Sequence, residues 1–458
     1  MRGILFLVAV LLAALALQAG LMAFAMYVLI GVFVLSRYLA KEWIGSVSAE
    51  RKMDIAEALE PGDSLEVRIR VENIGKVTIA WVLLEDLLPE AALRQRPPRM
   101  TLKGKRFKIG MIRPAQFLLM KYTIHFQSRG YYQIGPTLLE TGDLFGLHRR
   151  HRVVTAPAYV MVLPKVIPLP KYDFASQRPI GEVSLAHRLF EDPTRNAGVR
   201  PYQIGDPLQR VHWRATARTG QLQCRVFDPT TLAGATLVLD FHQEGYPQRR
   251  EPYRSDLAVT VAVSIAYSVT MLNQQLGLVS NGRDAADRIR LEIQSQIGSD
   301  DQVASYENRD QARESSEMLK ESERLRPVHV ETRRGIEQFQ RIREALARIE
   351  LTDGLTFSHL LLEMTPRFPR DATVIAILPT VSVEAATSLG ILRRQGFAVS
   401  AILIGLDHEE LPVAHGRLVA EGVRDVRHIS NEEELGLLGD RKAPETTENP
   451  YDMEIDLA

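Results

Sequence analysis

The chain has 458 residues, of which 45% are hydrophobic, and its formal net charge at pH 7 is zero. This length is sufficient for two or three domains with their own cores. A balanced charge gives no general electrostatic reason to bind nucleic acid, although a local basic patch could still do so, and we expect no nucleic-acid partner. The single cysteine, Cys224, excludes an intrachain disulfide and is expected to be a buried structural residue.

The chain begins with a long apolar stretch, in which no residue from Gly3 to Ser36 carries a charge. One transmembrane helix needs only about 20 residues, so this run is long enough for two. The natural break is Gln18-Ala19-Gly20, which predicts a helical hairpin within residues 1–42 that contacts lipid through residues 4–39. The two predicted helices cover about 4–17 and 21–39.

Basic residues flank this stretch on both sides: Arg2 precedes it, and Arg37 and Lys41 follow it. Lys and Arg tend to remain on the cytoplasmic side of a membrane. The pattern therefore predicts a multi-pass protein of the inner (cytoplasmic) membrane whose soluble domains face the cytoplasm. The alternative is a cleaved signal peptide ending near Ala23-Phe24-Ala25, although the apolar run continues well past that site.

Alternating apolar and charged residues follow the membrane segment. Residues 65–72 alternate with period two, which places one face of an antiparallel strand on a core and the other in water. Similar runs, separated by turn residues, occur at about 78–84, 117–126, 131–134 and 159–163. This spacing predicts an Ig-like β-sandwich over residues 47–166, and the prolines that follow it mark a linker.

The period changes in the C-terminal part of the chain. Strand-like runs at 235–240, 277–280, 373–378 and 398–404 alternate with helical patterns at 255–276, 336–349 and 381–395. This alternation predicts a doubly wound α/β domain over residues 231–440. A polar stretch at about 283–326 predicts a mobile, solvated and in part helical insertion that is dispensable for folding, and the tail 441–458 is expected to be disordered.

The segment 167–230, between the two predicted domains, contains the most distinctive motif. It reads Phe190-Glu191-Asp192-Pro193-Thr194-Arg195, then Arg200-Pro201-Tyr202-Gln203-Ile204-Gly205-Asp206-Pro207, then Arg210-Val211-His212-Trp213-Arg214-Ala215-Thr216-Ala217-Arg218-Thr219-Gly220. It resembles the hallmark of the bacterial and archaeal family called domain of unknown function 58. Residues 141–147, Thr-Gly-Asp-Leu-Phe-Gly-Leu, resemble the end of the preceding sandwich in that family. The resemblance covers nearly the whole chain, including the membrane hairpin.

The resemblance implies a C-terminal domain similar to von Willebrand A domains. It also implies a role alongside MoxR-type AAA+ ATPases, which are cytoplasmic and therefore fit the predicted topology.

Read from the residues alone, the motif gathers arginines among acidic residues. Arginine binds carboxylates through paired hydrogen bonds, so the cluster can fix a connecting loop onto a domain. A protein interface is the alternative, because Arg, Trp and Tyr anchor interfaces. Arg210, Arg214 and Arg218 share one side if the segment is helical, whereas His212 and Arg214 share a face if it is extended. The candidate partner-binding residues are Arg195, Tyr202, Asp206, Arg210, His212, Trp213, Arg214 and Arg218.

A metal-dependent domain of the von Willebrand A type carries Asp-x-Ser-x-Ser after its first strand, which supplies oxygen ligands suited to Mg²⁺. Here the loop reads Asp240-Phe241-His242-Gln243-Glu244, so both serines are replaced. A second aspartate expected after a later strand is also absent, since Leu378 leads into Pro379-Thr380. We interpret Asp240 as a degenerate site that binds no metal. Alternation leaves open that Asp240, His242 and Glu244 meet as a transition-metal or acid-base cluster.

The sequence contains neither a Gly-x-x-x-x-Gly-Lys-Ser/Thr phosphate loop nor a Gly-x-Ser-x-Gly elbow. We expect no catalytic residue and no cofactor. The predicted function is a membrane-anchored interaction scaffold or adaptor that works with a MoxR-type ATPase on envelope or complex assembly. The alternative is an enzyme or metal-dependent binder that uses the Asp240 loop.

Overall fold

A computed structural model gives the fold of the chain in two compact units, each with its own hydrophobic core. The first unit comprises residues 1–165, 283–326 and 343–350, and the second comprises residues 166–282, 327–342 and 351–458. The structure describes residues 10–12, 20–54, 58–143, 148–169, 191–203, 211–229, 234–289, 305–306, 308–319, 326–370 and 372–439, with backbone alone at 191–198, 226–229, 305 and 437–439.

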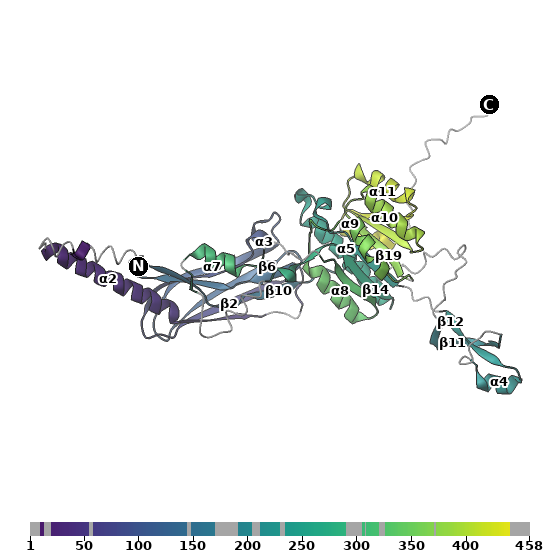
Figure 1. The fold of residues 1–458 in the computed structure, drawn as a ribbon, viewed down its shortest axis with the longest axis horizontal. Helices are drawn as coiled ribbons and strands as arrows, with labels where there is room; N and C mark the ends of the chain where they lie inside the picture. Colours follow the sequence, from purple (N-terminus) through teal and green to yellow (C-terminus); the bar gives the residue numbers. More distant parts are fainter. Residues whose placement is uncertain are drawn as a thin grey trace, which may run out of the picture. The chain divides into compact units, whose positions relative to one another are not determined.

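The second helix of the predicted hairpin is present as α2 (Gly20–Gly45) (Figure 1). In the described part of the chain, α2 is the helix that is long and apolar enough to cross a membrane. It continues beyond the predicted end at Leu39, because its last turns pack on protein: Ser36, Ala40, Trp43 and Ile44 are buried. The first predicted helix lies mostly outside the described residues.

The Arg152 side chain binds backbone carbonyl groups where α2 ends and strand β1 (Val47–Met53) begins. Its Nη1 atom donates hydrogen bonds to the carbonyl oxygens of Ile44, at 3.0 Å, and Val47, at 3.3 Å. An arginine at this position satisfies helix carbonyls that have no partner within the helix. Desolvation by burial lowers the pKa of Arg152. The end of α2 is therefore bonded to the domain that follows it.

That domain consists of two antiparallel sheets around a shared core. The first sheet has the order β1 (Val47–Met53), β2 (Ser64–Asn73), β6 (Phe117–Phe126), β4 (Met100–Gly104). The second has the order β16 (Ser305–Tyr306), β9 (Arg149–Val153), β8 (Thr137–Gly142), β3 (Ile79–Asp86), β5 (Phe107–Ile112). A separate pair joins β10 (Ala158–Val162) to β7 (Gly130–Ile134), and a short helix α3 covers Glu90–Arg94.

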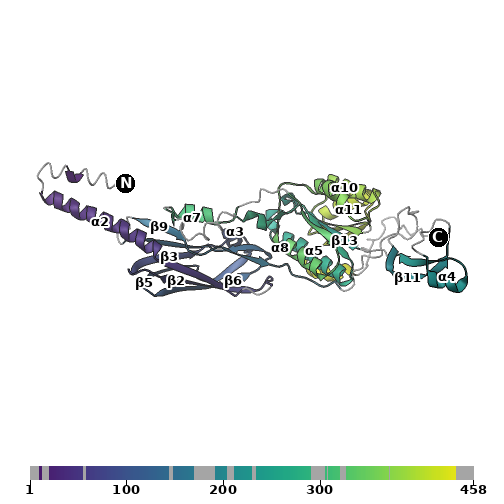
Figure 2. The same cartoon turned by 60° about the horizontal axis from the view of Figure 1, so that its bottom comes forward.

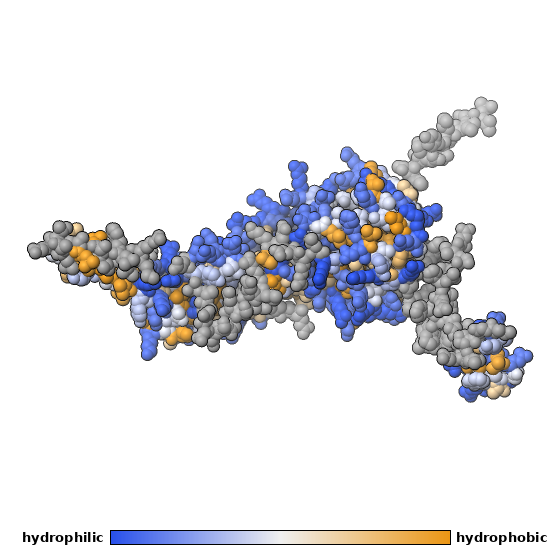
Figure 3. All heavy atoms as spheres, viewed as in Figure 1, coloured by the Kyte–Doolittle hydropathy of each residue, from blue (hydrophilic) through white to orange (hydrophobic). Residues whose placement is uncertain are grey.

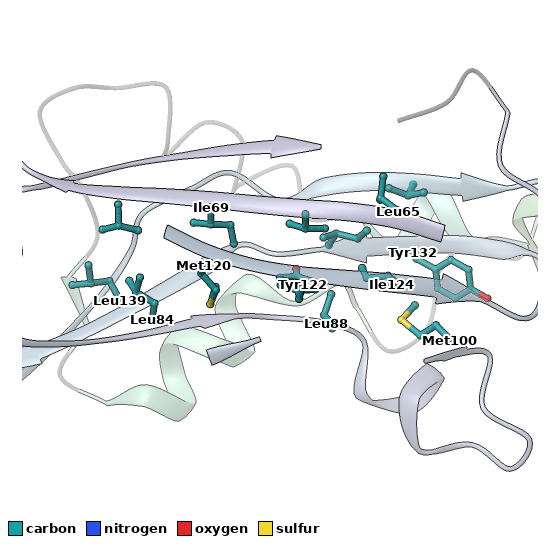
Figure 4. Close-up of a cluster of buried hydrophobic side chains, with 14 of the residues drawn as sticks. Leu65, Ile69, Leu84, Leu88, Met100, Met120, Tyr122, Ile124, Tyr132 and Leu139 are labelled. Atoms are coloured by element: carbon teal, nitrogen blue, oxygen red, sulfur yellow. The ribbon is translucent and has the colours of Figure 1, made fainter. Parts of the chain in front are cut away.

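The period-two pattern of residues 65–72 is confirmed in β2. Leu65, Val67, Ile69 and Val71 are fully buried, while the residues between them face outward. Figure 4 shows Leu65 and Ile69 in the buried hydrophobic cluster, which also contains Leu84 and Leu139 of the second sheet. This alternation fixes which face of the strand lies on the core.

The two sheets are also joined by buried charge. Arg51 of β1 forms an ion pair with Asp86 of β3, and the hydroxyl group of Tyr122 of β6 donates a hydrogen bond to the same carboxylate. Desolvation by burial, together with Asp86, raises the pKa of Tyr122. Gly135 gives the guanidinium room, because a Cβ atom there would lie 1.9 Å from Nη2 of Arg51.

The polar stretch near 283–326 differs from the solvated insertion that its composition predicts. Its described residues belong to the first unit. Strand β16 pairs with β9, and helix α7 (Arg309–Ser316) follows it. Arg309 and Arg313 of α7 both form ion pairs with Glu85, which is buried on β3. In the described part of this stretch, some of the charged residues therefore form ion pairs with the sandwich, which the composition alone did not predict.

Further contacts hold the same segment. Gln133 donates to the carbonyl oxygen of Ser316 at 2.7 Å and accepts from the backbone N–H of Met318 at 2.9 Å. Strand β15 (Arg283–Asp284) pairs with β18 (Ile349–Glu350). Arg288 binds both carboxylate oxygens of Glu350, at 2.6 and 2.8 Å.

The second unit contains a six-stranded, mostly parallel sheet, as the alternating pattern predicts. Its order is β17 (Val328–Arg333), β14 (Gln275–Ser280), β13 (Gly234–Leu239), β19 (Ala372–Leu378), β20 (Val399–Ile404), β21 (Asp425–Ile429). Strand β17 alone is antiparallel to its neighbour. After β13 the chain adds β14 and β17 on one side of it, and later adds β19, β20 and β21 on the other side. A topological switch point therefore lies between β13 and β19.

Helices cover both faces of this sheet, and Figure 2 shows α5 and α10 on opposite sides. One face packs on α9 (Phe357–Met364), α10 (Val383–Arg394) and α11 (Glu410–Ala420). Helix α5 (Tyr253–Met271) is buried along most of its length and contacts β13, β14, β19 and β20. Helix α8 covers Ile336–Arg348. A two-stranded sheet of β11 (Glu191–Pro201) and β12 (Gln223–Pro229), with helix α4 (Trp213–Thr219), carries the arginine-rich motif.

The Glu85 ion pairs generate a test of how the segment is held. Burial alone would raise the pKa of Glu85, but the hydrogen bonds and charges of Arg309 and Arg313 lower it overall. Glu85 therefore stabilises the docked segment above the unfolded value of 4.5 and loses that effect as the pH falls through the lowered pKa. Glu85→Gln should lower the free energy that holds α7 on the sandwich by about 1–2 kcal/mol. This figure is discounted for the partial exposure of both arginines.

Limited trypsin digestion of the full-length protein measures this loss, since cleavage after Arg309 and Arg313 requires α7 to detach. Glu85→Gln should be cut there several-fold faster than the wild type, and Glu314→Gln, which alters an exposed residue of the same helix, should not. Equal cleavage rates in the wild type and Glu85→Gln would contradict the role of the ion pairs.

Candidate functional site

The arginine-rich motif folds partly as the short helix α4. The His212 side chain accepts a hydrogen bond from the backbone N–H of Ala215 at its Nδ1 atom, at 3.1 Å, and so caps the amino end of the helix. Gly220 ends the helix with a φ of 70°, a left-handed conformation that glycine adopts without strain. Of the two conformations that the sequence leaves open, the structure has the helical one over 213–219.

One side of α4 faces β12, and the other side is exposed. The backbone N–H of Gln223 donates to Oγ1 of Thr216 at 3.0 Å, which turns that residue toward the strand. Trp213 is 67% exposed, and Arg214 and Arg218 are exposed on the same helix. In the described residues, neither arginine has a carboxylate partner. We refer to Trp213, Arg214 and Arg218 as the α4 face.

The other motif residues have different positions. Tyr202 is half-buried, and its backbone N–H donates to the carbonyl oxygen of Leu222 at 2.9 Å. Arg195 lies in β11, where the backbone alone is described, and Asp206 and Arg210 fall outside the described residues. Cys224 is buried in β12, in agreement with a structural role. The described candidates that share one element are therefore His212, as a cap, and the α4 face.

Asp240 directly follows β13 at the switch point of the α/β sheet. Parallel sheets of this kind bind ligands at the carboxyl ends of the strands near such a point. Oδ1 of Asp240 accepts hydrogen bonds from the backbone N–H of His242, at 3.2 Å, and from Nδ2 of Asn281, at 2.9 Å. The carboxyl group is buried, with 7% of the residue exposed. The position suits a ligand, but the donors that surround Asp240 already use one of its oxygens.

Asp240, His242 and Glu244 do not form a cluster. The chain leaves β13 at Leu239 and turns into a 3-10 helix over Gln243–Gly245, so the strand alternation that would align the three residues has ended. The Glu244 side chain is 87% exposed, and its Oε2 lies 3.9 Å from Nδ1 of His242. Within the part of the chain that the structure describes, no three His, Cys, Asp or Glu residues are placed to hold a metal ion.

Sequence reasoning missed Asn281, which organises this loop. It follows β14, and β14 is the parallel neighbour of β13, with Leu239 opposite Ser280. The Asn281 side chain accepts from the backbone N–H of Phe241 at 2.6 Å and donates to Asp240 and to the carbonyl oxygen of Leu355. The signal was available, because the residues after adjacent parallel strands meet at one edge of a sheet.

The family model that describes the family as "Protein of unknown function DUF58" matches residues 198–337. This match begins within the motif and covers the first half of the α/β sheet. A curated relative, "Uncharacterized protein YeaD" from Bacillus subtilis, is 24% identical over 270 residues, which is 58% of this chain and 64% of that protein. The chain therefore matches less than two thirds of the relative's length.

Solved structures share only limited similarity with the chain. Proximal thread matrix protein 1 from the mussel byssus is 11% identical over 45% of each chain, with a TM-score of 0.28. A CARDB domain from Pyrococcus furiosus is 12% identical and covers 26% of this chain and 87% of that one, with a TM-score of 0.17. A PapD-like domain of human CEP192 is 16% identical over 25% of this chain and 82% of that one, with a TM-score of 0.15. These TM-scores are too low to carry an argument about function.

The buried carboxyl of Asp240 predicts an unusual pH dependence. Desolvation raises its pKa, and the hydrogen bonds from Asn281 and His242 oppose this rise only in part. Because the folded pKa lies above the unfolded value of 3.8, stability falls as the pH rises through that interval. Asp240→Asn keeps an acceptor for both donors and removes the charge. It should raise the free energy of unfolding at neutral pH, because the folded protein no longer holds a buried charge.

Urea unfolding of the full-length protein in detergent, from neutral to acid pH, checks this expectation. The advantage of Asp240→Asn should shrink toward acid, and the exposed control Glu244→Gln should show neither effect. An Asp240→Asn variant that is less stable at neutral pH, together with Mg²⁺-dependent stabilisation of the wild type, would instead indicate a cation at this carboxylate.

Proposed function

We propose that the protein is a membrane-anchored scaffold without catalytic activity, which binds a cytoplasmic MoxR-type AAA+ ATPase through the α4 face. The observation that carries this proposal is the exposure of Trp213 on the same short helix as Arg214 and Arg218, which have no carboxylate partner among the described residues. Trp and Arg are enriched among the few interface residues that contribute most of the free energy of protein–protein binding. Covering an exposed indole ring with a partner removes a large apolar area from water, and this burial favours binding.

The α4 face also has the support that a binding surface needs. His212 and Gly220 cap the helix, and the hydrogen bond from Gln223 to Thr216 holds it on β12. A surface that is already ordered loses less conformational entropy when it binds. This organisation favours an interface over a loop held only by its own ion pairs.

Membrane attachment through α2 gives the scaffold its location. We propose that α2 is the second helix of a hairpin and that the soluble domains lie in the cytoplasm, where Arg37 and Lys41 favour that orientation. The ATPase partner is cytoplasmic, so the two would meet on one side of the membrane. The same family resemblance suggests that the six-stranded sheet is a von Willebrand A-like domain, which its strand order and the aspartate after β13 support.

The alternative function is a metal-dependent or catalytic site at Asp240, favoured by its place at the switch point of the sheet. The geometry supports this alternative less well, because Glu244 faces solvent and Oδ1 of Asp240 is used by protein donors. A scaffold therefore accounts better for both regions.

The partner interaction can be measured with the full-length protein in nanodiscs and the purified MoxR-type ATPase of the same cell. Trp213→Ala should weaken binding by about tenfold or more, the effect of losing a residue worth about 1.4–2 kcal/mol, and Arg214→Ala should weaken it by a smaller factor. Matched controls are Tyr253→Ala and Arg249→Ala, which alter an exposed aromatic residue and an exposed arginine outside α4. These should bind like the wild type.

Folded Trp213→Ala and Arg214→Ala variants that keep full affinity would remove the α4 face from the proposal. Failure of the wild type to bind the ATPase would remove the partner itself.

A further inference from the structure

Two turns of the sandwich meet the chain where it leaves α2. The backbone N–H of Ile74 donates to the carbonyl oxygen of Ser46, the residue after α2, at 2.9 Å. Asn73 joins the second turn, because its N–H donates to the carbonyl oxygen of Gln116 at 3.1 Å and its own carbonyl accepts from Ala115 at 3.0 Å. Residues 73–78 and 111–117 therefore lie at the same end of the sandwich as α2, and we call them the juxtamembrane end.

Asn73 holds both turns in place with its buried side chain. Nδ2 donates to the carbonyl oxygens of Val77, at 2.9 Å, and Ile112, at 3.0 Å, while Oδ1 accepts from the N–H of Gly75 at 2.9 Å. The turns are thus fixed to each other and to the residue after α2. Only Ser46 separates α2 from β1, so no flexible linker intervenes.

Large apolar side chains of the juxtamembrane end point into solvent. Ile74 is 68% exposed, Phe117 55%, Met111 54% and Val77 41%. Figure 3 shows apolar surface on the part of the sandwich beside α2. Exposed apolar residues in a contiguous group mark a surface that contacts protein or membrane.

Positive charge accompanies these apolar residues. Residues 73–78 and 111–117 contain Lys76 and Arg113, both exposed, and no Asp or Glu. The Arg70 guanidinium lies 4.4 Å from the centre of the Phe117 ring and also pairs with Glu72. Helix α2 adds exposed Arg37 and Lys41. A surface with this composition matches the phosphate groups of anionic lipids.

We propose that the juxtamembrane end of the sandwich inserts into the headgroup region of the same membrane that α2 crosses, with Lys76 and Arg113 on anionic phospholipid. This inference rests on the proposed membrane span of α2. Apolar side chains beside cations are the features by which peripheral surfaces enter the interface of a bilayer. A second protein would also cover apolar residues, but the direct connection to α2 and the exposed cations Lys76 and Arg113 in the two turns favour lipid. The contact fixes the orientation of the sandwich on the membrane.

The test uses the full-length protein with Cys224→Ser, reconstituted into vesicles of phosphatidylcholine with or without phosphatidylglycerol. Single cysteines at Ile74 or Phe117 carry an environment-sensitive fluorophore, and lipids with a nitroxide near the headgroup act as the quencher. The matched control is Ser64→Cys, in the same strand as Asn73 and about 30 Å from it at 3.3 Å per residue. Labels at 74 and 117 should be quenched several-fold more than the label at 64, most strongly with phosphatidylglycerol.

The charge contribution is measured in the Ile74→Cys protein. Lys76→Glu with Arg113→Glu should reduce the quenching in phosphatidylglycerol vesicles by at least half, whereas Lys52→Glu, in β1 away from this end, should leave it unchanged. An equally strong signal in the double variant would overturn the role of anionic lipid.

Flotation of the vesicles after carbonate treatment separates the two proposals. If the protein no longer floats, the membrane span itself fails. If it floats but the labels at 74 and 117 are quenched no more than that at 64, the inference about the juxtamembrane end is wrong and the anchor stands. Labels shielded from aqueous iodide but not reached by the lipid nitroxide would show that protein covers this end, which also overturns the inference.

Discussion

The burial of the last turns of α2 in the sandwich core is the constraint on which the first unit depends. Trp43 and Ile44 belong to the same hydrophobic cluster as the two sheets, and Arg152 binds the carbonyl oxygens at the end of the helix. An apolar helix that ends inside a folded domain cannot tilt or rotate without disturbing that core. The position of the sandwich is therefore coupled to the helix that precedes it.

Charged residues contribute to the interior of the first unit as well as to its surface. Asp86 accepts hydrogen bonds from Tyr122 and Thr137 and pairs with Arg51, so both of its oxygens have partners. A buried ion pair is retained at a cost in desolvation, which such hydrogen bonds must offset. Glu85 repeats this arrangement with the two arginines of α7. These pairs fix one arrangement of strands and of the segment from the second half of the sequence.

Strong periodicity made most of the fold predictable. The alternation in β2 and the apolar runs of β13, β19 and β20 identify those strands because their environments are uniform along their length. Strand β5 and the docking of the segment that carries β16 and α7 on the sandwich were not predicted, because their partners are distant in sequence and their composition is that of exposed chain. At the site, the spacing of Arg214 and Arg218 predicted a shared side of the helix. The contact of Asn281 with Asp240 was missed, because it required knowing that β13 and β14 are parallel neighbours.

The central claim is that an anchored scaffold meets its ATPase partner at the α4 face. It is tested most directly by photo-crosslinking in living cells, with a photoreactive amino acid at position 213 of the full-length protein. The account predicts a discrete adduct that contains the MoxR-type ATPase and is absent when the photoreactive residue replaces Arg249, which is exposed outside α4. Adducts with the ATPase from position 249 and not from position 213, or none from either, would contradict it.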